Sequence, residues 1–149
     1  MLLQGFAIEL WRQPDLKSLC LSLQEQFHLN VNLVLFALWL EAHQLQLSAG
    51  SWSKAERVLN ESSRDFLLNL RALRKQLKYE HSELACAQQL KQALLQAELE
   101  LELRELALLQ ELADSEAVSG ECDQLRQYLK QFDNIDAQQF AEQLRCCCK

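Results

Sequence analysis

From residue 53 to residue 79 the hydrophobic and the charged positions separate onto two faces of one predicted helix. The hydrophobic face consists of Ala55, Leu59, Phe66, Leu70, Leu73 and Leu77. The opposite face carries a row of cations: Arg57, Arg64, Arg71, Lys75 and Lys78, with Arg74 on its flank. Such a helix is expected to bury its apolar side and to offer solvent a basic face about 30 Å long, at ~1.5 Å per residue. Ser62 and Ser63 mark a weak point in this helix because serine is a weaker helix former.

A second long helix is predicted over about residues 83–113, where Leu, Glu, Gln and Ala dominate. Its leucines form two seams on a helical wheel: Leu90, Leu94, Leu101, Leu108 and Leu112 in one, and Leu95, Leu99, Leu106 and Leu109 in the other. Two seams predict two helical neighbours, either both within the chain or one from a second chain. Glu98, Glu102 and Glu105 lie between the seams and are interpreted as a solvated or salt-bridging ridge.

Shorter helices are predicted at both ends of the chain, over residues 3–12, 14–26, 31–43, 122–132 and 137–145. Pro14 suits a first helical turn, Asn30 is a candidate N-cap, and Asp136 with Gln139 resembles a capping box. The predicted fold is therefore all-α: a compact multi-helix bundle with two long helices, at about 53–79 and 83–113. One helical domain is expected over residues 1–145, followed by a cysteine-rich flexible tail over residues 146–149.

The charge of the chain is unevenly distributed. The 149 residues are 49% apolar and carry a net charge of −6. Residues 51–79 hold seven Lys and Arg against three Asp and Glu, whereas residues 80–149 hold six against fourteen. A largely acidic surface repels phosphate and argues against a general nucleic-acid coating protein, but one local basic contact stays compatible with it.

The N-terminal stretch MLLQGFAIELW has no basic residue before its apolar positions, so no secretion signal is predicted. The longest nearly uncharged apolar run, Leu29 to Leu40, is about half of the ~20 residues that a membrane-spanning helix needs. We therefore expect a cytoplasmic protein with no membrane insertion. In that compartment its six cysteines are expected to be reduced.

Motifs for catalysis and metal binding are missing from the sequence. His28, His43 and His81 are scattered, without the spacing of a zinc site. Glu25 and His28 have the Glu-x-x-His spacing of a di-iron site once, and such a site needs it twice. No glycine-rich phosphate loop or nucleophile elbow occurs. The sequence thus predicts no catalytic residue, metal site or cofactor, and it favours a protein that is not an enzyme.

Several segments resemble an uncharacterised proteobacterial family of small helical proteins, a domain of unknown function. They are Cys20-Leu21-Ser22-Leu23-Gln24, Leu29-Asn30-Val31-Asn32-Leu33, Leu38-Trp39-Leu40 and the run from Leu70 to Lys78, together with Trp11. The family pattern has proline before the Leu-Arg pair, whereas this chain has Asn69, which puts a bend in the basic helix in doubt. The resemblance implies a bacterial, cytoplasmic setting and no assigned activity.

The basic face leads to the first functional hypothesis, a non-enzymatic interaction module that docks an acidic protein or ribonucleoprotein surface. Its contact residues would be Arg57, Arg64, Arg71, Arg74, Lys75 and Lys78, with Trp52 beside them. The alternative for this face is that it is only solvated, or paired internally with Glu61 or with the glutamate ridge of residues 98–105.

Two further hypotheses belong to other classes. One is a structural or regulatory homodimer joined through a leucine seam of helix 83–113. The other is an enzyme or small-ligand binder with a helical pocket near Trp39, lined also by Asn32 and His43.

Overall fold

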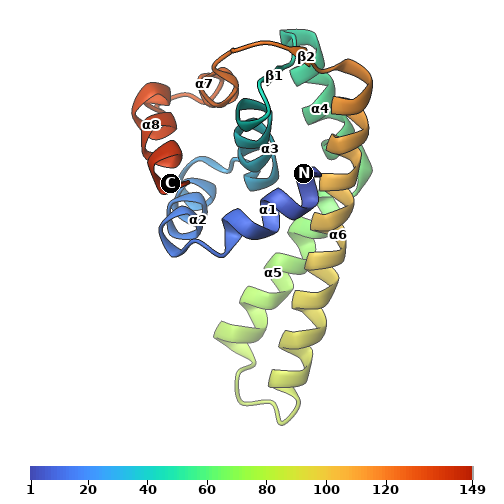
Figure 1. The fold of residues 1–149 in the computed structure, drawn as a ribbon. Helices are drawn as coiled ribbons and strands as arrows, with labels where there is room; N and C mark the ends of the chain where they lie inside the picture. The colour runs from blue at the N-terminus through green and yellow to red at the C-terminus, as the bar shows by residue number, and fades with distance from the viewer. Residues whose placement is uncertain (149) are drawn as a thin grey trace.

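The computed structural model describes residues 1–148, which form eight helices and one pair of short antiparallel strands (Figure 1). In chain order the elements are α1 (Leu3–Trp11), α2 (Pro14–Phe27), α3 (Val31–Ala42), β1 (Leu45–Gln46), α4 (Ala49–Ser62), α5 (Arg64–Glu80), α6 (Ala87–Glu116), β2 (Val118–Ser119), α7 (Gln124–Leu129) and α8 (Ala137–Cys147). This architecture confirms the predicted all-α class. No helix of the described residues is both long and apolar enough to cross a membrane.

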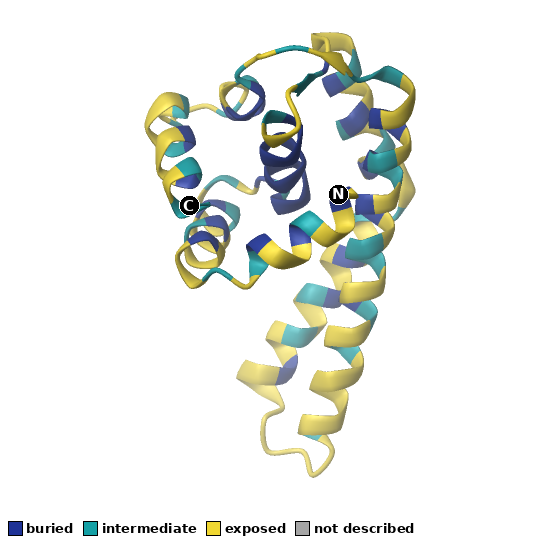
Figure 2. Ribbon diagram, viewed as in Figure 1, coloured by how far each residue is buried: buried dark blue, intermediate teal, exposed yellow. Residues whose placement is uncertain are grey.

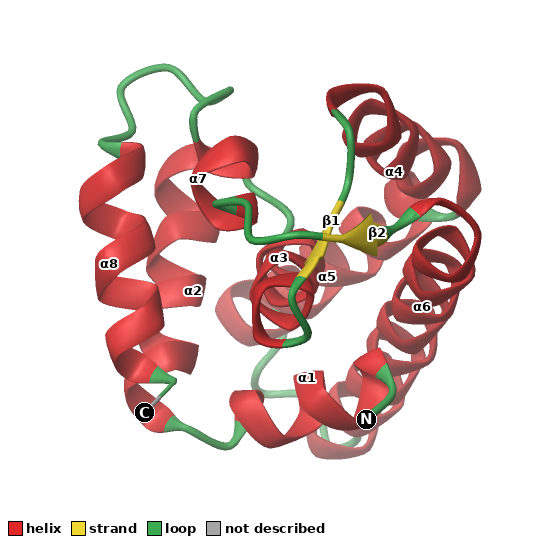
Figure 3. Cartoon of the chain, turned by 45° about the horizontal axis from the view of Figure 1, so that its top comes forward, coloured by secondary structure: helices red, strands yellow, loops and turns green. Residues whose placement is uncertain are grey.

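Helix α3 lies at the centre of the molecule, and other helices surround it (Figure 3). Every residue from Val31 to Leu40 is buried, and none of them carries a charge (Figure 2). Helices α1, α2, α6 and α7 pack against α3. A helix that is apolar on all sides needs neighbours on all sides, so this segment determines where the hydrophobic core lies.

The helix starts predicted at residues 14, 31 and 137 are confirmed, whereas α6 and α7 begin later than predicted, at Ala87 and Gln124. Pro14 is the first residue of α2, where its missing N–H costs no helical hydrogen bond. The side chain of Asn30 accepts a hydrogen bond from the N–H of Asn32 at 2.9 Å, as an N-cap does. At the start of α8, Asp136 accepts from the N–H of Gln139 at 3.1 Å.

A break at Ser63 divides the helix predicted over residues 53–79 into α4 and α5. Ser63 has φ −137° and ψ 16°, outside the helical region, so the expectation of one continuous helix is corrected. The break also changes which face of the second half points inward. Leu67 is buried there, whereas Phe66 and Leu73, both predicted on the apolar side, are 60% and 50% exposed.

Helices α5 and α6 pack side by side as an antiparallel pair. We call α5 together with the N-terminal half of α6 the arm, since this part extends beyond the other helices (Figure 1). The arm ends in the turn between Glu80 and Ala87, and α6 runs three residues beyond the predicted end at residue 113.

The C-terminal cysteines differ from the predicted tail. Cys146 and Cys147 are the last residues of α8, and both Cys147 and Cys148 pack against the hydrophobic core. The α8 helix extends because its apolar face, with Ala141 and Leu144 buried, continues to have a neighbour in α2. The final position of the predicted tail, residue 149, lies outside the described residues.

Candidate functional site

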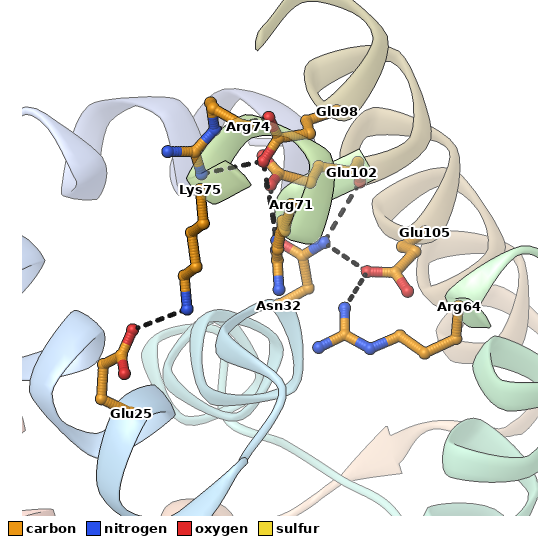
Figure 4. A network of polar contacts seen from close by, with 9 residues as sticks. All are labelled: Glu25, Asn32, Arg64, Arg71, Arg74, Lys75, Glu98, Glu102 and Glu105. Carbon is orange, nitrogen blue, oxygen red and sulfur yellow. Dashed lines mark hydrogen bonds and ion pairs between the residues drawn. The ribbon is translucent and has the colours of Figure 1, made fainter. Parts of the chain in front are cut away.

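Three arginines of the predicted basic face, Arg64, Arg71 and Arg74, lie against glutamates of α6 in the interface between α5 and α6 (Figure 4). Arg64 pairs with Glu105 at 3.4 Å. Arg71 contacts Glu102 at 3.0 Å. Arg74 holds both carboxylate oxygens of Glu98, with N–O distances of 2.7 and 3.0 Å. The glutamate ridge thus pairs with Arg64, Arg71 and Arg74 inside a helical hairpin, which is the internal pairing given above as the alternative. The expectation of a basic face open to solvent is corrected for these three residues.

The ion pairs repeat at heptad spacing along the arm. Arg64 and Arg71 are seven residues apart on α5, and their partners Glu105 and Glu98 are seven residues apart on α6 in the opposite direction; Arg71 Nε lies 3.9 Å from Glu98. Two antiparallel helices place such positions opposite each other at successive levels. A slip of either helix by one turn would leave buried charges without partners, which costs more than a pair contributes. The pairs therefore favour this register over a slipped one.

Asn32 connects the ion pairs to the central helix. Its side-chain amide donates to Glu105 Oε1 at 2.9 Å and to the carbonyl oxygen of Glu102 at 3.2 Å. Glu105 is 1% exposed, and Arg64 shares the same carboxylate oxygen. Burial lowers the pKa of Arg64, while the facing carboxylate of Glu105 raises it again in part. This arrangement ties α3, α5 and α6 together through one buried carboxylate.

The other predicted contact residues are dispersed. Arg57 is exposed on α4, and Lys78 lies over the ring of Tyr79 near the end of the arm. Lys75 makes an exposed ion pair with Glu25 of α2 at 3.3 Å. Trp52, expected to be available for contact, is 5% exposed in the core, where its indole N–H donates to the buried Gln124 at 2.8 Å. The structure thus does not assemble the predicted set into one surface.

A groove of about 1080 Å³ lies between α1 and α2 on one side and α5 and α6 on the other. The first turns of α3 also line it, including Asn32. Trp39 and His43, the other two residues of the hypothetical small-ligand pocket, do not line it. Arg71 and Arg74 do, so part of the predicted basic set borders the groove after all.

The groove combines apolar walls with free positive charge. Ile8, Leu21, Leu95 and Leu99 line it, and each is between 36% and 44% exposed. Arg12 and Lys17, on the α1–α2 wall, form no ion pair within residues 1–148. Lys17 Nζ lies 5.8 Å from the centre of the Trp11 ring, a favourable cation–π arrangement. The groove is therefore suited to an apolar ligand that also carries negative charge.

Sequence reasoning missed the α1–α2 wall of this groove. The signal was present: Arg12 and Lys17 are the only Lys or Arg residues among the first 50, and they flank Pro14. Isolated cations at a helix–helix turn usually indicate only a solvated surface. What distinguishes this pair is the arm opposite it, which comes from residues far along the chain.

The described part of the chain contains no candidate metal site. No group of three or more His, Cys, Asp or Glu side chains in residues 1–148 is arranged to hold an ion. Arg145 occupies the polar depression near Glu41 and Asp123 by pairing with both carboxylates, and these pairs raise the pKa of Arg145.

Comparison with known families gives one match. A family model described as "Protein of unknown function (DUF2390)" matches residues 3–109. Comparisons with curated proteins and with solved structures found no match. Every residue that lines the groove falls within the matched range, whereas α7 and α8 fall outside it.

Proposed function

Since this chain belongs to the DUF2390 family of proteins of unknown function, we propose its function from the geometry of the groove: a non-enzymatic helical interaction module that holds an acidic segment of a partner protein. The match over residues 3–109 confirms the resemblance to an uncharacterised family that the sequence indicated. The groove is built entirely from that part of the chain. The proposed setting is the bacterial cytoplasm, which is what the resemblance implies.

One observation carries the proposal: Arg12 and Lys17, which have no ion-pair partner within residues 1–148, lie beside exposed leucine and isoleucine side chains in a chain of net charge −6. Exposed apolar side chains that cluster around a concave site favour a binding role over mere solvation. Positive charge at the rim of such a site attracts acidic partners and repels basic ones. The net negative charge of the chain repels an acidic partner elsewhere on the surface, so docking is directed to the groove.

The groove replaces the basic face as the proposed contact surface. Arg64 and Arg71 are nearly buried against glutamates, so their charge is largely neutralised inside the arm. Arg12 and Lys17 take their place as the cations that a partner would meet. Arg74 contributes at the opposite wall, because it lines the groove and its side chain stays about one-third exposed.

The reversal of both free cations, Arg12→Glu with Lys17→Glu, is expected to abolish capture of the acidic partner from a lysate of the source organism. The reason is that two attractive contacts at the groove become repulsive. Captured proteins are quantified by mass spectrometry at low and at high salt. The binding of a partner that is held by charge is expected to weaken as the salt concentration rises.

The control for this experiment is Arg57→Glu with Lys78→Glu, which makes the same change in net charge at exposed cations that do not line the groove. A partner that is lost from the groove variant and kept by the control supports the proposal. The same set of captured proteins for the wild type and the groove variant would contradict it.

A homodimer through the arm is the second candidate function, and a specific observation favours it. In the first leucine seam of α6, Leu112 is buried, whereas Leu94, Leu101 and Leu108 are half-buried. Leu90 stays exposed, as do Phe66 and Leu73 of α5. These exposed apolar side chains all belong to the arm, and a second copy packed on the arm would cover them.

We expect Leu73→Lys with Leu90→Lys to shift the protein toward the monomer if the arm is a dimer interface, because burial of two lysine charges opposes association. Sedimentation equilibrium over a wide concentration range measures this shift. Wild-type protein that stays monomeric at every concentration contradicts the homodimer.

A further inference from the structure

We propose that the segment held in the groove is an amphipathic α-helix with an apolar stripe and acidic residues along one edge only. This inference rests on the proposed function and names the kind of partner that fits the site. A helix with its side chains is about 10–12 Å across, so a groove of about 1080 Å³ has room for about two turns.

The arm wall offers an apolar track of the kind on which helices pack. Leu95, Leu99, Leu103 and Leu106 line the groove at successive helical spacings along α6. The C-terminal end of this track already belongs to the core, where α1 packs on α6 and the N–H of Leu3 bonds to Gln110 at 2.8 Å. The other end, at Leu95 and Leu99, stays exposed. A bound helix would pack against Leu95 and Leu99 and so extend along α6 the helix packing that α1 begins.

The two walls differ in their free charge. On the α1–α2 wall, Arg12 and Lys17 have no acidic partner in residues 1–148. On the arm wall, each charged side chain that lines the groove already has a partner: Arg71 and Arg74 pair with Glu98 and Glu102. The edge of the bound helix that faces α1 and α2 should therefore carry Asp or Glu, and the edge that faces the arm should be uncharged.

An extended peptide has no comparable support in this groove. Binding of an extended strand uses main-chain hydrogen bonds to a free sheet edge. The residues that line the groove come from helices and from the turns between them, and neither β1 nor β2 is among them. Helical backbone has its own hydrogen bonds satisfied, so only side-chain packing is available here. This is the arrangement in which an amphipathic helix docks into a groove.

The experiment uses synthetic peptides of about four helical turns. The first has leucines along one stripe and glutamates along one edge. The second has the same residues in an order that destroys the stripe, and the third has lysine in place of each glutamate. Binding to the full chain is followed by the fluorescence of Trp11, which lines the groove, whereas Trp39 and Trp52 are buried in the core. The variant Trp11→Phe verifies the origin of the signal.

We expect the striped glutamate peptide to bind about tenfold more tightly than either other peptide, as two rim contacts of modest strength and the lost packing imply. Circular dichroism should show that it gains helix on binding. In the variant Arg12→Glu with Lys17→Glu the preference should reverse, so that the lysine peptide binds more tightly than the glutamate peptide. A reversal of this kind does not follow from a general loss of folding.

The outcomes separate this inference from the proposed function. The inference of a helical partner is overturned if the striped and the reordered peptide bind equally well and both depend on Arg12 and Lys17. The proposal that the groove binds an acidic segment is unaffected by that result. The helix is also overturned if no peptide binds while capture from the lysate still depends on the groove cations. If that capture disappears after nuclease treatment, the occupant is a nucleic acid, and both proposals fall. They fall as well if neither peptide binding nor capture responds to the charge reversal.

Discussion

Replacement of Glu105 by alanine is expected to lower the free energy of unfolding by about 3–5 kcal/mol, because it leaves the nearly buried guanidinium of Arg64 without a counter-charge. The amide of Asn32 loses an acceptor in the same step. Urea unfolding measures the effect as a shift of the midpoint with an unchanged slope.

The cause of this loss is tested by the double variant Arg64→Met with Glu105→Leu. Apolar side chains of similar size remove both charges together, so most of the lost stability should return. As a control, Glu25→Ala breaks the exposed pair with Lys75 and should cost less than about 1 kcal/mol. If the double variant is as unstable as Glu105→Ala, the loss does not come from the unpaired charge of Arg64.

Replacement of Gln124 by methionine is expected to cost about 2–4 kcal/mol. The side-chain oxygen of Gln124 accepts from the N–H of Leu47 at 3.1 Å and from the indole N–H of Trp52 at 2.8 Å. Methionine has nearly the same length but no comparable acceptor, so two buried donors lose their hydrogen bonds. Thermal or urea unfolding gives the size of the effect.

The matched control for this substitution is Gln131→Met, which removes an exposed glutamine that bonds to Glu56. Water can replace that contact, so the control should change stability by less than about 0.5 kcal/mol. Equal losses of stability at the two positions would show that the buried hydrogen bonds of Gln124 contribute no more to stability than an exposed one.

Both predictions concern polar residues that sequence patterns did not identify as buried. The helical pattern places Glu105 on a solvated or salt-bridging ridge, and Gln124 has no distinguishing neighbour in the sequence. A helical wheel shows where a glutamate lies on its own helix, but not whether an arginine faces it. Burial of Glu105 becomes possible only because Arg64 and Asn32 arrive from other helices.

The amino-acid sequence by itself determined the all-α class, the apolar helix at residues 31–43 and the ends of the first three helices to within one residue. These features depend on residues within a few positions of each other. An unbroken apolar run such as Val31–Leu40 is stable only when it is covered, and caps such as Asn30 act on the very next turn. The resemblance to an uncharacterised family, later matched over residues 3–109, also came from short local segments.

Only the tertiary structure decided how the charged face of α5 is used and where the groove lies. One non-helical residue, Ser63, rotates α5 so that its arginines meet the glutamates of α6. The groove then joins residues 7–35 to residues 71–106, which are distant in the chain. The rotation of a helix is set by competition among all of its neighbours for apolar and ionic contacts. That competition is a property of the packed molecule, and no periodicity within one helix contains it.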